Sequence, residues 1–144
     1  MAKIIAVCTS TEKGIKKSNV QQGELVPQLG LAGDAHAGDW HRQVSLLAME
    51  SIEKIKAKGL DVAPGDFAEN LTTQGIVLHT LPIGQKFRIG TALLEVTQIG
   101  KECHSRCNIF QTVGDCVMPR EGIFARVLVG GPVAVEDRIE LVAE

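Results

Sequence analysis

The stretch TALLEVTQIGKECHSRCNIFQTVGDCVMPREGIFARVLVGG, residues 91–131, contains two strand-like runs around a segment rich in reactive side chains. The runs Ala92–Ile99 and Ile123–Val129 are short, apolar and rich in β-branched residues, as buried β-strands are. The segment between them holds three of the four cysteines and one of the four histidines, namely Cys103, Cys107, Cys116 and His104. We expect the rest of the chain to form a scaffold for this segment.

Similar short runs recur along the chain, each ended by Gly, Pro or charged residues. They are Lys3–Cys8, Gln22–Val26, Phe87–Ile89 and Arg138–Val142. One segment, Val44–Lys58, has the apolar spacing of an α-helix, and Gly59 suits its C-terminal cap. Many short strands with one good helix predict a mainly β fold with α, in the form of a closed or nearly closed β-barrel decorated by the helix.

Length and composition are those of an average soluble globular protein. The chain has 144 residues, of which 44% are hydrophobic and 22% charged, so we expect one domain spanning 1–144. A formal net charge of -2 and only five aromatic residues (one Trp, four Phe) argue against nucleic-acid binding. No signal peptide or membrane-spanning run is visible, so a cytoplasmic protein is expected.

The cysteines are expected to be thiols or metal ligands, because disulfides are rare in a reducing compartment. Arg106 and His104 would lower the pKa of the Cys107 thiol if they face it. The spacing Cys103-x3-Cys107-x8-Cys116 is not a standard zinc pattern, yet with His104 the set could gather three or four zinc ligands. Cys8 lies inside an apolar run and fits a structural role.

Other polar residues allow two interpretations each. The glycine-rich loop Leu29–Asp39 either has Asp34 capping a turn with His36 solvated, or lines a site together with His41 and Arg42. Arg120 either recognises a phosphate or carboxylate or forms a surface pair with its neighbouring glutamate. The lysine-rich run Ser10–Ser18 is expected to be a loop whose lysines either form a solvated face or contact a phosphate.

Glu69 and Asn70 follow Phe67 and offer an acceptor and an amide at a strand end. Phosphate-binding Gly motifs and the Gly-x-Ser-x-Gly motif are absent from the sequence, so nucleotide-binding folds and serine hydrolases have no support.

Three runs in this order, GDAHAGDWHRQVSLLAMESI (33–52), FAENLTTQGI (67–76) and LEVTQIGKECHSRCNIFQTVGDCVMPREGIFARVLVGG (94–131), resemble the MOSC domain, named after the C-terminal part of molybdenum cofactor sulfurase. The resemblance is to the small stand-alone bacterial type and covers about Lys3 to Leu141. It implies a MOSC-type (pyruvate-kinase-like) β-barrel with one main helix and short helical segments. It also implies an essential cysteine shortly before an apolar pair, here Cys107.

The resemblance implies two functional roles for Cys107. Either Cys107 ligates molybdenum in a module that binds molybdopterin, with a molybdenum-dependent reductase as the enzymatic extension, or it carries persulfide sulfur to a metal–sulfur centre. Cys103 and Cys116, which single-cysteine relatives lack, would resolve the persulfide as further catalytic residues. A zinc-stabilised β-barrel interaction domain without catalytic activity is the alternative.

The remaining expectations concern ligands and partners. Arg106, Arg120 and Lys101 would meet the pterin phosphate, and a second tier of cofactor-binding residues comprises His36, His41, Arg42, Glu69 and Asn70. Pyridoxal phosphate is a family label that belongs to a separate half of the sulfurase and is not expected here. Partners would be molybdenum-cofactor pathway proteins, a sulfur donor or a second copy of the chain.

Overall fold

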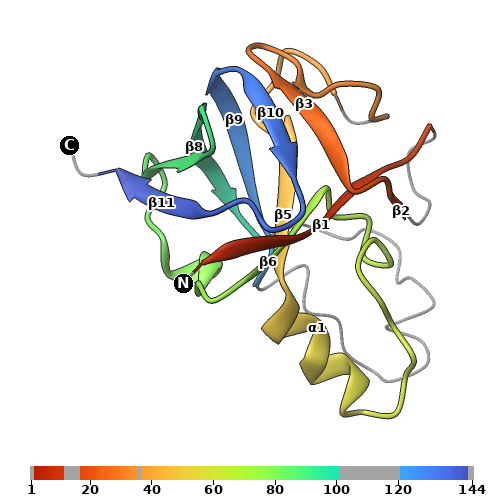
Figure 1. The fold of residues 1–144 in the computed structure, drawn as a ribbon. Helices are drawn as coiled ribbons and strands as arrows, with labels where there is room; N and C mark the ends of the chain where they lie inside the picture. Colours follow the sequence, from red (N-terminus) through yellow and green to blue (C-terminus); the bar gives the residue numbers. More distant parts are fainter. Residues whose placement is uncertain (1, 12–16, 36, 101–120, 143–144) are drawn as a thin grey trace.

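The computed structural model describes residues 2–11, 17–35, 37–100 and 121–142, which form two β-sheets and one α-helix (Figure 1). The larger, eight-stranded sheet has the order β11-β7-β8-β9-β5-β6-β1-β2, and the smaller has the order β10-β3-β4. Strands of the larger sheet are β1 (Lys3–Thr9), β2 (Ser18–Asn19), β5 (Val44–Ala48), β6 (Leu71–Gln74), β7 (Lys86–Ile89), β8 (Ala92–Ile99), β9 (Ile123–Val129) and β11 (Ile139–Val142). The others are β3 (Gln22–Val26), β4 (Gly30–Leu31) and β10 (Gly131–Ala134), with α1 at Met49–Lys56 and a 3-10 turn η1 at Leu78–Thr80.

The larger sheet is mixed. Strand β5 pairs parallel with β6 and antiparallel with β9. Its five residues are all buried because both of its faces are covered. On one face Val44 and Leu46 join the main core, and on the other Leu47 packs with Ile52 and Ile55 of α1 in a second apolar cluster.

The predicted helix Val44–Lys58 is therefore wrong over its first five residues, which form β5. A strand buried on both faces is a continuous apolar run, and periodicity cannot tell such a run from a helical segment. The helix itself is confirmed for Met49–Lys56, where Figure 1 shows it continuing from the end of β5.

The mainly β class with one α-helix is confirmed, whereas a closed barrel is not. In the described part of the chain, β1 meets the β11 end of the sheet only at a single bridge between Lys3 and Arg138. Three backbone hydrogen bonds accompany it, among them one of 2.8 Å from the Ile4 amide to the Asp137 carbonyl. The eight strands therefore form an open ladder whose ends approach each other.

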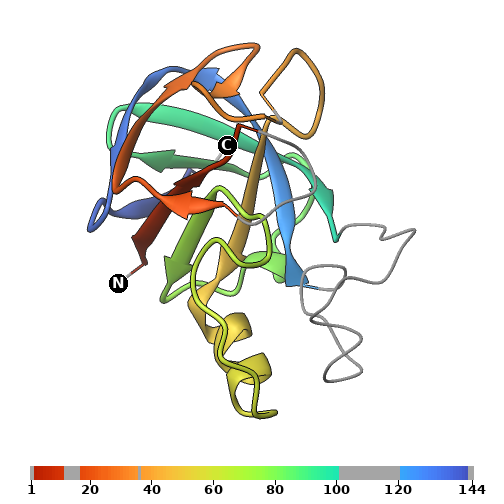
Figure 2. The ribbon, with the colours of Figure 1, turned by 90° about the vertical axis from the view of Figure 1, so that its right-hand side faces the viewer.

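Strands β8 and β9 have the bounds predicted from the opening stretch, and the structure pairs them with each other in antiparallel orientation. Their last paired residues are Ile99 and Ile123, and the Gly100 amide donates to the Gly122 carbonyl at 2.6 Å. The end of β8 and the start of β9 are thus adjacent, and both lie on the same side of the molecule in Figure 2. Eight residues predicted to have a functional role lie outside the described residues: His36, Lys101, Cys103, His104, Arg106, Cys107, Cys116 and Arg120.

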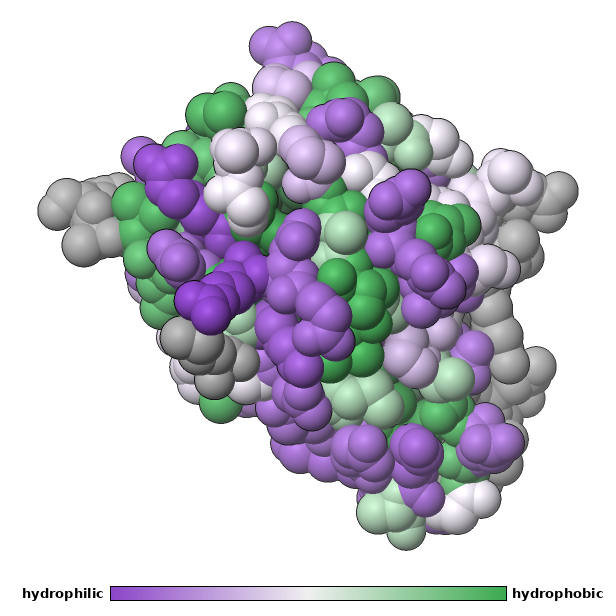
Figure 3. Space-filling view, in the orientation of Figure 1, coloured by the Kyte–Doolittle hydropathy of each residue, from purple (hydrophilic) through white to green (hydrophobic). Residues whose placement is uncertain are grey.

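The face shown in Figure 3 has hydrophilic and hydrophobic residues side by side. Within the described ranges, no helix is long and apolar enough to cross a membrane.

Candidate functional site

Two side chains predicted to line a site, His41 and Arg42, meet at one atom. They precede β5, and both contact the side-chain oxygen of Gln98 near the end of β8. His41 Nε2 lies 2.9 Å from Gln98 Oε1, and Arg42 Nε donates to the same oxygen at 3.0 Å. The Thr97 hydroxyl donates to the His41 carbonyl, which fixes the backbone between these contacts.

Two aromatic rings contact His41 and Arg42. The Arg42 guanidinium carbon lies 5.2 Å from the centre of the Phe124 ring, within the range of a cation–π contact. The Trp40 ring stands edge-on to His41 with 5.9 Å between ring centres. Phe124 is 6% exposed and anchors the guanidinium to the apolar cluster under α1.

Glu69 and Asn70, the other two described candidates, lie in a second, fully buried polar group at the start of β6. Asn70 joins three strands: its amide nitrogen donates to the Cys8 carbonyl at 3.1 Å, and its oxygen accepts from the Ser45 amide at 3.0 Å and hydroxyl at 3.1 Å. Asn70 therefore fixes the ends of β1, β5 and β6 relative to one another, and truncating it would leave several buried groups unpaired.

The Glu69 carboxyl is 0% exposed and only half satisfied. Its Oε2 accepts from the Gly65 amide at 3.0 Å and the Thr72 hydroxyl at 2.7 Å. Its Oε1 has no hydrogen-bond partner in the part of the chain that the structure describes. Burial raises the pKa of Glu69 above its usual value, although the hydrogen bonds from Gly65 and Thr72 act to lower it. This glutamate is the one buried acid of the group.

A buried ion pair that the sequence pattern did not predict lies near Cys8 and Glu69. Lys17 Nζ lies 2.7 Å from Asp34 Oδ1, and both side chains are 0% exposed. Ser10 binds both partners, since its hydroxyl accepts from Lys17 at 3.2 Å and its amide donates to Asp34 at 3.1 Å. The expectation that the lysine-rich run is solvated is therefore wrong for Lys17. Pairing between distant loops leaves no local signal in the sequence.

Cys8 is a buried free thiol beside this pair, as its apolar surroundings predicted. Burial, with a contribution from the Glu69 carboxyl, raises the pKa of Cys8 to about 12, although Lys17 acts to lower it. Because the thiolate is the reactive form of cysteine, Cys8 is chemically inert in the folded protein.

Glu121, two residues before β9, is bound to α1 through its side chain. Its carboxylate accepts from the Ser51 hydroxyl at 2.6 Å and from Lys54 at 2.8 Å. Burial acts to raise the pKa of Glu121, but the hydrogen bonds from Lys54 and Ser51 outweigh it and hold the pKa below its ordinary value. The chain thus returns to β9 from an anchored position.

The structure brings the four described candidates together in two pairs, His41 with Arg42 and Glu69 with Asn70. Both pairs are joined through β5, because Ser45, which bonds to Asn70, follows Arg42 by three residues. Gln98 was missed by sequence reasoning, although a glutamine directly before the Ile–Gly end of an apolar strand is a weak signal. Among the described residues, no group of three or more His, Cys, Asp and Glu could hold a metal ion. The zinc prediction concerns residues outside them.

One family model and several solved structures match this chain. The sequence model of the MOSC domain matches residues 33–140. The structure is similar to that of the YuaD protein from Bacillus subtilis, with a TM-score of 0.80, 18% identity, and coverage of 98% of this chain and 96% of that one. It is also similar to YiiM from Geobacillus stearothermophilus (TM-score 0.74, 20% identity, coverage 99% and 76%) and YiiM from Escherichia coli (0.68, 25%, 100% and 71%). No curated protein sequence gives a significant match. Since the family's sequence model covers most of its length, this chain belongs to the MOSC domain family.

Proposed function

We propose that this chain is a molybdenum-cofactor-related MOSC protein that works through Cys107, either by binding molybdenum or molybdopterin or by carrying persulfide sulfur. The MOSC family is associated with proteins of the molybdenum cofactor sulfurase type. The observation that carries the proposal is the complete burial of Cys8, which raises the pKa of its thiol to about 12 and disfavours the reactive thiolate. Any thiol chemistry therefore falls to the three cysteines between β8 and β9.

The described surroundings of that segment suit an anionic ligand such as molybdopterin. Arg42 lies three residues before Ser45 on β5 and touches Gln98, two residues before Gly100, where the segment begins. Cys107 would hold the molybdenum, since a soft thiolate suits a thiophilic metal. Lys101, Arg106 and Arg120, with Arg42, would hold the anionic part of the ligand. When bound, the cofactor supplies the redox chemistry of molybdenum.

In the carrier role, the Cys107 thiolate attacks the outer sulfur of a donor persulfide. The donor's S–S bond breaks, the donor leaves as a thiolate, and Cys107 retains the transferred sulfur as a persulfide. Attack by Cys103 or Cys116 on the inner sulfur then forms a disulfide and releases hydrosulfide for the acceptor centre. The natural partners are a sulfur donor or proteins of the molybdenum-cofactor pathway.

We also propose that residues 1–144 form a single domain.

Elemental analysis and cyanolysis test the proposal on protein purified from a molybdenum-replete host. We expect near-stoichiometric molybdenum, or cyanide-releasable sulfur, that is lost in Cys107→Ala and retained in the matched control Cys8→Ala. Molybdenum identifies the binding role, and sulfur without metal identifies the carrier. If the wild-type protein carries neither, or if both variants behave alike, the proposal is wrong. Zinc that survives in Cys107→Ser and is needed for refolding would instead support the interaction domain.

A further inference from the structure

The side-chain amide of Gln98 has a fixed orientation. Its nitrogen donates to the Gly100 carbonyl at 2.8 Å, and its oxygen accepts from Arg42 Nε at 3.0 Å. Arg42 Nε can only donate, so the atom that faces it must be the amide oxygen. Gln98 therefore holds Arg42 in one place beside the end of β8.

The same oxygen determines which nitrogen of His41 carries a proton. Because an amide oxygen only accepts, His41 Nε2, at 2.9 Å from it, must be the donor. His41 Nδ1 is then left with no partner in the described part of the chain. It is available to a ligand, because the His41 side chain is exposed.

Arg42 is a partly buried cation that has no counter-ion among the described residues. Its Nε is used by Gln98 and its guanidinium lies against the Phe124 ring. None of the ion pairs among the described residues includes Arg42, and its two terminal nitrogens have no hydrogen-bond partner there. Gln98 binds the Nε edge of this guanidinium, and the Phe124 ring lies against it. Its two terminal nitrogens can therefore donate a pair of hydrogen bonds to an oxyanion.

We propose that Arg42 and His41 form a binding subsite for the phosphate of a phosphate monoester, with Gln98 and Phe124 as positioning residues. The fork of Arg42 satisfies two phosphate oxygens, and His41 Nδ1 faces the third, whereas a carboxylate has only two oxygens to offer. With Nε2 as the donor to Gln98, Nδ1 is an acceptor and suits a phosphate oxygen that carries a proton. The subsite rests on the proposed function in one respect: the phosphate belongs to the ligand of the same MOSC site.

The single tryptophan of the chain, Trp40, reports on this subsite, because its ring lies edge-on to His41. We would titrate the full-length protein with inorganic phosphate at constant ionic strength and follow Trp40 fluorescence, with acetate as the carboxylate control. Phosphate should give a saturable change, and acetate should bind about tenfold more weakly or worse, because it lacks the third oxygen.

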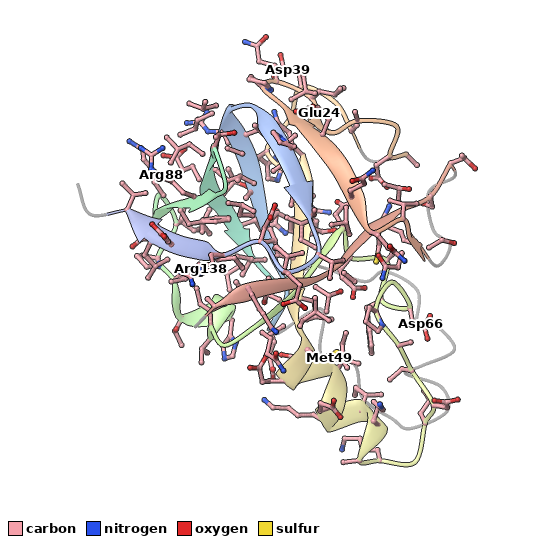
Figure 4. All side chains as sticks on the ribbon, in the orientation of Figure 1. Glu24, Asp39, Met49, Asp66, Arg88 and Arg138 are labelled. Carbon is pink, nitrogen blue, oxygen red and sulfur yellow. The ribbon has the colours of Figure 1, made fainter. Side chains whose placement is uncertain are left out.

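Three variants and a control locate the binding. Arg42→Met should weaken phosphate binding about tenfold or more, and Arg42→Lys should restore only part of it because a lysine has no fork. Gln98→Glu should abolish binding while the protein stays folded, since the new carboxylate occupies the guanidinium. The control is Arg88→Met, which removes the same charge from an exposed position on β7. Figure 4 labels Arg88, and this variant should leave phosphate binding unchanged.

Unaltered phosphate affinity in folded Arg42→Met or in Gln98→Glu would overturn the inference, as would an equal loss in Arg88→Met. Cys107→Ala separates it from the proposed function, because phosphate binding does not use the thiol and should persist. Phosphate binding that fails while Cys107 still carries molybdenum or sulfur rejects the subsite alone. Phosphate binding in a protein that carries neither rejects the proposed function alone.

Discussion

The buried carboxyl of Glu69 makes the stability of this protein depend on pH in a direction opposite to that of most acidic residues. Glu69 is 0% exposed, its Oε1 has no hydrogen-bond partner among the described residues, and burial raises its pKa. The folded protein therefore holds a proton at Glu69 that the unfolded chain gives up above a pKa of about 4.3. Glu69→Gln replaces the carboxyl with a neutral group of the same shape and removes this titration.

The expected magnitude follows from proton linkage. Below about pH 4.3 both states are protonated at Glu69, and this residue adds no pH dependence. Above that pH, the free energy of unfolding of the wild type should fall by up to about 1.4 kcal/mol per pH unit until the folded-state pKa is reached, and then stay level. The contribution is thus lost as pH rises, and Glu69→Gln should become steadily more stable relative to the wild type over this window.

Urea unfolding of both proteins at half-unit pH steps measures the difference in the free energy of unfolding. Glu121→Gln is the contrasting control: the pKa of Glu121 is held low by Lys54 and Ser51, so its contribution is present above about pH 4.3 and lost as the pH falls. The two variants should therefore give differences of opposite slope. A pH-independent difference for Glu69→Gln, or one in which the wild type gains stability as pH rises, would show that Glu69 is ionised in the folded state.

Three further predictions concern the same end of the sheet. Lys17→Met should lower the free energy of unfolding by about 3–5 kcal/mol because it removes the buried cation that faces the Asp34 carboxylate, and changing Asp34→Leu as well should recover most of the loss in urea titrations. Cys8 should stay unmodified by iodoacetamide at pH 8 until the protein is unfolded, as peptide mass spectrometry would show; early labelling would contradict its raised pKa of about 12. Gly65→Ala should lower the melting temperature far more than Gly59→Ala. Both glycines have positive φ, but a Cβ at Gly65 would clash with the Lys17 carbonyl oxygen, whereas a Cβ at Gly59 meets nothing within 4 Å; equal shifts would refute the steric argument.

The sequence predicted those parts of the fold whose pattern is local. Strands β8 and β9 were found residue for residue because apolar, β-branched runs ended at glycines on both sides. The apolar spacing of Val44–Lys58 predicts helix for the run VSLLA, which forms β5, because this run is buried on both faces and continues directly into α1. Strands of two residues, such as β2 and β4, carry too few side chains to show any period.

The candidate site was predictable only in part, for a related reason. His41 and Arg42 stood out as neighbouring polar residues after a glycine-rich loop, but their common partner Gln98 comes from β8, where the register shifts between Val96 and Gln98. A bulge decides which way such a side chain points, and the sequence does not show it. The pairing of Lys17 with Asp34 likewise depends on two loops meeting in space.

The hydrogen bond between Gly100 and Gly122 marks the boundary between the β8–β9 ladder and the part of the sequence that carries the candidate reactive cysteines. Everything between those glycines can change in length or composition while the ladder of β8 and β9 keeps its register, because lengthening a closed loop adds little entropic cost. A lineage could therefore exchange one reactive segment for another on an unchanged frame. An engineer could do the same, with the two glycines as the points of insertion.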